Sequence, residues 1–195
     1  LRTIDPSMGS IVLSKNSLSG MLPTELNKIS MPKLKHLMLG ENSLTESIPS
    51  WLTAQRVPSL EVLDMSDNQI HGELPSLSGW HHLSDALFHK NSLKGSLTAL
   101  DPNSDWFMDS NANRTKLKTL TLHSNHITST IPEHFVVPYN LENFTLAYNQ
   151  IQGSIPRSML TNISSDSQSF FWQGNRLSCA LPNWQNVKLT KSSLV

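Results

Sequence analysis

The chain has 195 residues, a formal net charge of zero at pH 7 and a charged fraction of only 15%. This balance provides no long-range attraction to nucleic acid or to an anionic membrane, so neither is an expected partner. No apolar run approaches the roughly 20 residues that span a bilayer. No signal peptide is visible either, and we interpret the sequence as a mature or excised segment of a longer chain.

One short pattern recurs seven times, with the consensus LxxLxLxxNxLxGxLP. In chain order the copies cover 11–23, 37–49, 63–75, 86–98, 120–132, 144–156 and 170–182, and the fourth copy lacks the final proline. Each copy has an asparagine in the same position: Asn16, Asn42, Asn68, Asn91, Asn125, Asn149 and Asn175. Their separations, by subtraction, are 26, 26, 23, 34, 24 and 26 residues. Repeats of this length predict a solenoid of stacked coils.

Each copy begins with an apolar–polar–apolar stretch, which predicts a short β-strand with its apolar side chains in the core and the others outside. An asparagine in a buried run needs hydrogen-bond partners, and its carbonyl and NH₂ groups can bond the backbone of its own and the neighbouring coil. We therefore expect the seven asparagines to form a ladder along the stack. Gly20, Gly72, Gly95 and Gly153 then permit a backbone turn, and the proline directs the chain toward the convex side.

These motifs resemble leucine-rich repeats, and the trailing LxGxIP is similar to the plant-specific class of receptor-like kinases, receptor-like proteins and polygalacturonase-inhibiting proteins. The resemblance covers about residues 8–182 of a single domain, 1–195, with an insertion at about 98–116 and a C-terminal flank at 183–195. It implies an α/β repeat solenoid, a right-handed coil with a parallel β-sheet on its concave face and loops, short helices or 3-10 turns on its convex face. The paired cap cysteines of that class are missing, because the single cysteine, Cys179, occupies the usual glycine position.

Outward strand positions should stack in columns spaced by about 4.8 Å, and the family resemblance implies that this concave face binds the partner. The face is mixed and mildly polar, without a basic stripe or a continuous aromatic track, which suits a protein, peptide or glycan ligand. Two opposite-charge neighbours are expected on it, Lys15–Glu41 and Asp67–Lys90. The candidate binding residues are His36, Met38, Asp64, Asp67, Asp85, Leu87, His89, Lys90, Thr121, His123, Tyr148 and Phe171.

His89 and His123 occupy the same outward position in consecutive copies, so they should face one another, with Asp64 and Asp85 nearby. Three interpretations stay open: two polar residues on a solvated strand face, a divalent-metal set of two histidines and one carboxylate, or a shared response below about pH 6.5. We assign neither a metal nor a cofactor. His126 directly follows a ladder asparagine and is expected to be exposed.

The widest repeat spacing creates the insertion, which can shift the register of the flanking coils. Its Trp106, Phe107 and Met108 either fold back onto the solenoid or act as a contact anchor. Three sequons predict N-glycosylation and a secreted protein: those of Asn113, Asn143 and Asn162. Asn143 maps to the strand face, where a glycan would obstruct binding. We interpret Cys179 as a buried small residue, with a disulfide to a group outside this segment as the alternative.

The sequence contains no HExxH, GxSxG, Walker or GxGxxG motif, so we assign no catalytic residue and expect no enzymatic activity. The expected function is that of an extracellular or cell-surface recognition module, receptor-like, which binds a protein, peptide or glycan. One alternative is a structural repeat segment of a cell-wall or surface filament, with self-association through the solenoid ends. The other is an inhibitor of a secreted hydrolase.

Overall fold

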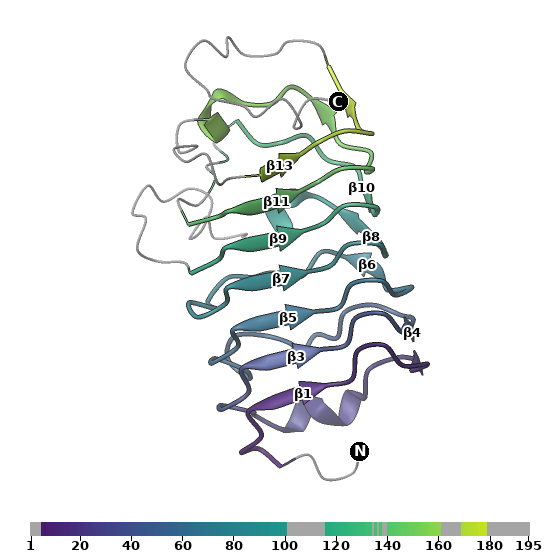
Figure 1. Cartoon of the computed structure of the whole chain (residues 1–195), viewed down its shortest axis with the longest axis vertical. Helices are drawn as coiled ribbons and strands as arrows, with labels where there is room; N and C mark the ends of the chain where they lie inside the picture. Colours follow the sequence, from purple (N-terminus) through teal and green to yellow (C-terminus); the bar gives the residue numbers. More distant parts are fainter. Residues whose placement is uncertain are drawn as a thin grey trace.

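The computed structural model describes residues 5–100, 116–133, 135, 137, 140–160 and 169–178. In these segments the backbone winds as a parallel β-solenoid with almost no helix, which confirms the leucine-rich repeat coil expected from the sequence. The coils stack along the long axis, with β1 toward one end of the described stack and β13 toward the other (Figure 1).

A parallel sheet of seven strands forms one face of the described stack, and its order follows the chain: β1-β3-β5-β7-β9-β11-β13. The strands overlap the predicted apolar–polar–apolar stretches and begin one residue earlier: β1 (Ser10–Val12), β3 (His36–Met38), β5 (Val62–Asp64), β7 (Asp85–Leu87), β9 (Thr119–Thr121), β11 (Asn143–Thr145) and β13 (Ser169–Phe171). The insertion between β7 and β9 does not shift the register. Asp85 still pairs with Thr119, and Leu87 with Thr121.

The segments after the asparagines form a second set of short parallel strands, which the sequence pattern did not predict. They are β2 (Ser19–Gly20), β4 (Ser43–Leu44), β6 (His71–Glu73), β8 (Ser92–Gly95), β10 (His126–Ile127), β12 (Gln152–Gly153) and β14 (Arg176–Leu177). Within the described residues they pair as β10-β8-β6, β12-β14 and β2-β4. The backbone is extended here because one coil donates to the carbonyl of the previous coil, as Ser43 N–H does to Leu18 O (2.8 Å).

Each coil bends at left-handed backbone positions. The predicted glycine turns have φ values of 78°, 90°, 101° and 80° at Gly20, Gly72, Gly95 and Gly153, so the expectation for these glycines is confirmed. Glu46 fills the same position in the second copy, with φ 67°. A further bend, which the sequence did not predict, precedes every ladder asparagine, with φ from 50° to 70° at Lys15, Glu41, Asp67, Lys90, Ser124, Tyr148 and Gly174.

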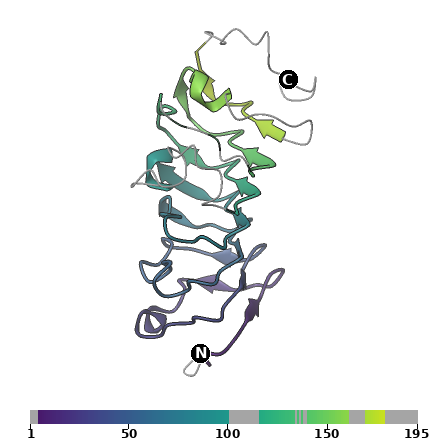
Figure 2. The ribbon, with the colours of Figure 1, turned by 90° about the vertical axis from the view of Figure 1, so that its left-hand side faces the viewer.

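The convex side carries loops and 3-10 turns, as expected. In the described part of the chain these turns are η1 (Thr24–Lys28), η2 (Leu97–Leu100) and η3 (Arg157–Leu160). Figure 2 shows them on one side of the stack and the large sheet on the other. Within the same residues, none of the helices is long and apolar enough to cross a membrane.

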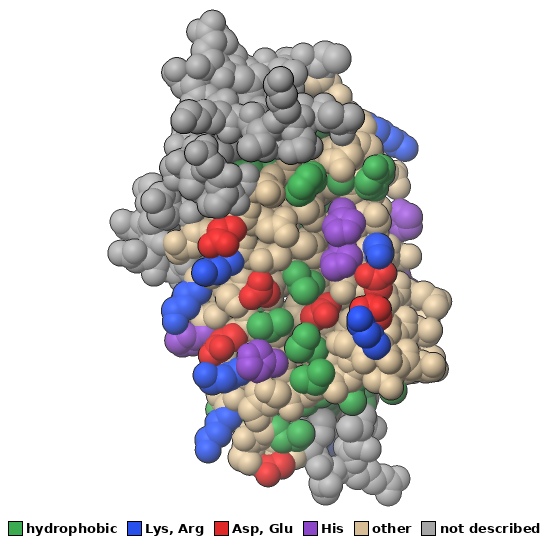
Figure 3. Space-filling view, viewed as in Figure 1, with side chains coloured by type: hydrophobic (Ala, Val, Ile, Leu, Met, Phe, Trp, Pro, Cys, Tyr) green, Lys and Arg blue, Asp and Glu red, His purple; other side chains and the backbone are tan. Residues whose placement is uncertain are grey.

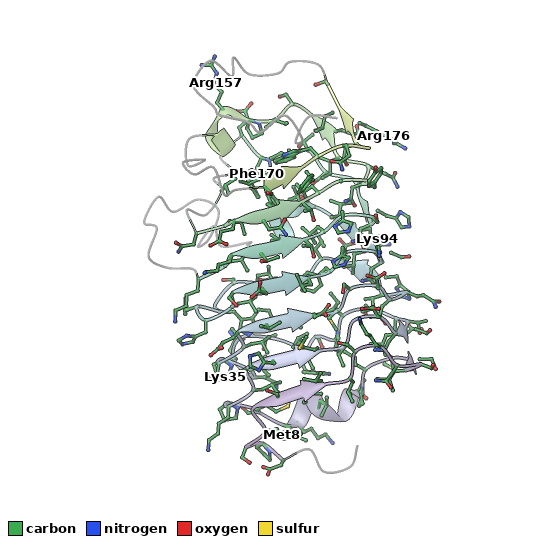
Figure 4. The ribbon with its side chains drawn as sticks, in the orientation of Figure 1. Met8, Lys35, Lys94, Arg157, Phe170 and Arg176 are labelled. Carbon is green, nitrogen blue, oxygen red and sulfur yellow. The ribbon has the colours of Figure 1, made fainter. Side chains whose placement is uncertain are left out.

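A continuous apolar core lies between the sheet and the convex turns. The central residue of each inner strand is at most 4% exposed: Leu37, Leu63, Ala86, Leu120, Phe144 and Phe170. The first coil differs, because Leu13 and Leu18 are 37% and 38% exposed whereas their counterparts Leu39 and Leu44 are 2% and 4% exposed. Figure 4 shows the exposed Met8 beside the first coil and the core residue Phe170 in β13 toward the other end.

Candidate ligand-binding face

The ladder asparagines hold the strands of the concave face in register. Asn125 is representative: its Oδ1 accepts a hydrogen bond from Leu93 N–H (2.9 Å) of the preceding coil. Its Nδ2 donates to Phe88 O (3.0 Å) of that coil and to Leu122 O (3.1 Å) of its own. Bonds of both kinds recur at Asn42, Asn68, Asn91, Asn149 and Asn175. In the described residues Asn16 bonds only carbonyls of its own coil.

The outward side chains of the seven strands stand in two columns with the predicted membership. They are Ser10–His36–Val62–Asp85–Thr119–Asn143–Ser169 and Val12–Met38–Asp64–Leu87–Thr121–Thr145–Phe171. Figure 3 shows that apolar, acidic, basic and histidine side chains alternate over this face without a stripe of one charge. Lys35 and Lys94 lie on opposite edges of it (Figure 4).

The predicted binding residues differ in how well a ligand can reach them. Lys90 and Tyr148 are exposed, Tyr148 by 59%. Thr121 is only 6% exposed and is hydrogen-bonded to His89, so it positions that ring and is a poor contact for a ligand. The others are partly exposed: His36, Met38, Asp64, Asp67, Asp85, Leu87, His89, His123 and Phe171.

The charges on this face are largely compensated inside the protein. Lys90 Nζ lies 2.8 Å from Asp67 Oδ1, and this hydrogen bond raises the pKa of Lys90. Asp64 Oδ1 accepts bonds from the backbone N–H and the hydroxyl of Ser66, at 3.0 and 2.6 Å. The second predicted opposite-charge pair is also present, with 3.4 Å between Lys15 and Glu41. A ligand therefore meets an outer layer of half-buried apolar and imidazole groups more than free charge.

His89 and His123 form a stacked pair, with ring centroids 4.5 Å apart and an angle of 15° between the planes. Each Nδ1 shares a hydrogen bond with a threonine hydroxyl of the next coil: His89 with Thr121 at 2.7 Å, and His123 with Thr145 at 2.9 Å. These two tethers were not predicted from the sequence. They hold each ring to the next coil through its Nδ1.

The carboxylate beside the pair is a different one from those expected. Asp67 Oδ2 lies 3.4 Å from His89 Nε2, whereas Asp64 acts on His89 only through its charge. The bend before Asn68 brings Asp67 toward the pair, which a reading of the strand columns alone does not show. The pKa of His89 is lowered mainly by burial, and that of His123 by burial and then by the charges of His89 and Lys90. Among the described residues, no group of three or more acidic, histidine or cysteine side chains is arranged to hold a metal ion.

Several predicted sites lie outside the described residues: Trp106, Phe107, Met108, Asn113, Asn162 and Cys179. Asn143 is described and lies in β11, half-buried on the sheet face. Its Oδ1 is buried and has no hydrogen-bond partner in the described part of the chain.

The stacked coils and their asparagine ladder define the class of fold, which is a leucine-rich repeat coil. The family model described as Leucine Rich Repeat matches residues 33–54, 59–80 and 116–136. Several solved structures that resemble the chain are plant receptor kinases, so it is similar to the plant type of this class. No curated protein matches the chain.

Three solved structures illustrate the similarity. The Arabidopsis receptor kinase HAESA, solved with the peptide hormone IDA and the co-receptor SERK1, has a TM-score of 0.71 and 25% identity over 89% of this chain. The Arabidopsis receptor kinase GASSHO1/SCHENGEN3, solved with CASPARIAN STRIP INTEGRITY FACTOR 2, has a TM-score of 0.62 and 26% identity over 88%. The plant peptide hormone receptor RGFR1, solved with RGF2, has a TM-score of 0.59 and 26% identity over 87%. The chain spans only 26%, 22% and 29% of these three proteins, respectively.

Proposed function

We propose that this chain is an extracellular, receptor-like recognition module that binds a peptide or an extended protein segment on its concave face. The observation that carries the proposal is the uninterrupted seven-strand sheet with partly exposed apolar and imidazole side chains in fixed register. Two of the similar structures named above are HAESA with the peptide hormone IDA and the peptide hormone receptor RGFR1 with RGF2, and this supports a peptide ligand here.

The physical basis of binding is a preorganised surface. The coils are fixed by the buried asparagine ladder, and therefore little conformational entropy is lost when a ligand orders the face. Met38 in β3 and Leu87 in β7, with β5 between them, offer partly exposed apolar contacts, and Tyr148 offers an exposed aromatic ring toward the C-terminal coils. Aromatic and apolar anchors of this kind supply most of the binding free energy at protein interfaces.

A random peptide library, displayed and selected against the native chain at pH 7.5, tests the proposal. Leu87→Arg places a charge in the middle of the face and should weaken the selected peptides by at least about tenfold. Gln69→Arg is the matched control, because Gln69 is exposed but lies outside the outward columns. Both variants should unfold at nearly the wild-type temperature. Equal weakening by the two substitutions, or by neither, would contradict the concave face as the binding site.

Self-association through a solenoid end is a second candidate function, which one observation favours. Leu13, Leu18 and Met21 of the first coil are exposed at 37%, 38% and 57%, although apolar residues in the next coil are covered. Sedimentation velocity of the purified chain over a range of concentrations tests it. Leu18→Glu should abolish any oligomer that uses this surface, whereas a wild-type chain that is monomeric at all concentrations excludes the assembly.

A further inference from the structure

The His89–His123 stack is held by three consecutive coils, and its geometry constrains how it takes up protons. The ring centroids are 4.5 Å apart, so a charge on one ring acts at short range on the other. The threonine tethers prevent the rings from swinging apart, because each Nδ1 is bonded to the coil beyond. Two groups coupled in this way titrate as a unit and accept one proton more readily than two.

The charged groups that face the pair come from the coil before it and from its own. Asp64 and Asp67 precede it, and Lys90 follows His89 directly. Asp67 is shared, since its Oδ1 binds Lys90 Nζ at 2.8 Å while its Oδ2 lies 3.4 Å from His89 Nε2. The coil of β11 contributes the neutral Thr145 hydroxyl.

The same geometry defines what a ligand can place on the pair. Leu87 is partly exposed two residues before His89, so the rings have an apolar neighbour on the face. The nearest lysine and carboxylate already form an ion pair with each other. Within the described part of the chain, His123 forms one hydrogen bond, which joins its Nδ1 to the Thr145 hydroxyl. An uncharged apolar or aromatic side chain fits this environment better than an ionised one.

We propose that the stacked pair makes recognition proton-dependent: the concave face binds an uncharged apolar or aromatic peptide segment over the two neutral rings and releases it when the pair is protonated. This inference rests on the proposed peptide-binding function. It also assigns the pair a specificity role, because a ligand with an acidic side chain at this point would respond to pH in the opposite sense.

The direction in which the affinity changes with pH follows from the burial of the two rings. Burial already lowers the pKa of both imidazoles in the free protein, and a ligand that covers them excludes more water and lowers each pKa further. The complex therefore holds fewer protons than the free protein. Affinity must fall as the pH decreases through the titration of the free pair, by up to about tenfold per pH unit for each proton that binding displaces.

The first measurement needs no ligand. Imidazole Cε1–H resonances of the whole chain are followed by NMR from pH 8 to pH 4.5, and His89→Gln and His123→Gln assign the two signals. Both should titrate below the ordinary histidine pKa of about 6.5, and each single variant should shift the titration of the remaining partner. Two independent titrations at the ordinary histidine pKa would overturn the coupling on which the inference depends.

The second measurement uses peptides selected at pH 7.5 from a library without His, Asp or Glu, capped at both ends so that only the protein titrates. Peptides that Leu87→Arg weakens are measured between pH 7.5 and pH 5.0 on wild type, His89→Gln, His123→Gln and the control His126→Gln. Wild type and the control should lose affinity in acid, and the two pair variants should show a flatter profile. His123→Gln alone suffices if His89→Gln does not fold.

The two proposals fail in different ways. If no selected peptide is weakened by Leu87→Arg at any pH, the concave face is not the binding site and the proposed function is wrong. If such peptides bind but keep the same Kd down to pH 5.0, or lose affinity equally in the pair variants, the function stands and the proton-dependent pair is wrong.

Discussion

Removal of one ladder asparagine is the sharpest test of how this fold is held together. In Asn125→Ala, the buried Leu93 N–H loses its acceptor at 2.9 Å. The two carbonyls that accept from Asn125 Nδ2 keep other hydrogen-bond donors in this variant. Phe88 O also accepts from Asn91 Nδ2, and Leu122 O also accepts from Asn149 Nδ2. One orphaned buried donor costs about 1–3 kcal/mol, and the lost bonds add roughly 1 kcal/mol, so we expect a loss of about 2–4 kcal/mol in the free energy of unfolding.

Asn16→Ala is the matched control, since Asn16 is exposed and bonds only Leu13 O (3.0 Å) and Ser14 O (3.1 Å) in the described residues. It should cost less than about 1 kcal/mol, because water can replace exposed bonds. Urea denaturation followed by far-UV circular dichroism measures both variants. If Asn125→Ala costs no more than Asn16→Ala, the inter-coil ladder does not stabilise the stack and the reasoning is refuted.

Further predictions concern the backbone, the buried indoles and pH. Gly72→Ala should lower the free energy of unfolding by about 1–2 kcal/mol, because φ at Gly72 is 90° and a Cβ would lie 3.0 Å from Ser47 Cβ. Glu46→Gly should leave the free energy of unfolding unchanged or raise it by up to about 1 kcal/mol, because Glu46 has a φ of 67° that glycine adopts without strain. Trp80→Phe should lower the free energy of unfolding, measured by thermal unfolding, by about 1 kcal/mol more than Trp51→Phe does. Trp80 Nε1 donates a hydrogen bond to Val57 O at 2.9 Å, whereas the buried Trp51 Nε1 has no partner among the described residues. The lowered pKa values of His89 and His123 mean that the unfolded chain takes up protons first, so stability should decrease as the pH falls through about 6.5, with a smaller slope in His123→Gln.

The main sheet could be predicted from the sequence because its signal is carried by side chains. The asparagine and the apolar positions recur in every copy, and together they fix the strands, their order and their register. The insertion left the pairing of Asp85 with Thr119 unchanged. The register on the two sides of the insertion therefore follows from the repeat pattern alone.

The second set of strands and the bend before each asparagine could not be predicted, because they depend on backbone dihedral angles and not on residue type. The bend positions are occupied by lysine, glutamate, aspartate, serine, tyrosine and one glycine, which share no side-chain chemistry. A consistent left-handed φ there is imposed by the coil. The single visible signal was Gly174 in the last copy, at φ 70°.

At the candidate site the histidine pair could be predicted but its surroundings could not. Alignment of the copies places His89 beside His123, and the rings are in fact stacked. The contacts with Asp67, Thr121 and Thr145 run diagonally between columns and depend on the direction in which each ring leans. The sequence pattern contains no information on that direction, and it therefore predicts Asp64 and Asp85 beside the pair but not Asp67, which is 3.4 Å from His89.

The most direct test of the central claim locates a bound peptide on the chain. A library-selected peptide that carries a benzoylphenylalanine residue is photo-crosslinked to the native protein, and the modified residues are identified by mass spectrometry. We expect crosslinks to the outward side chains of the seven-strand sheet, at Met38, Leu87 or His123 and their neighbours. Crosslinks concentrated on the side of the second set of short strands, at Gln69 or His126, would contradict peptide binding on the concave face.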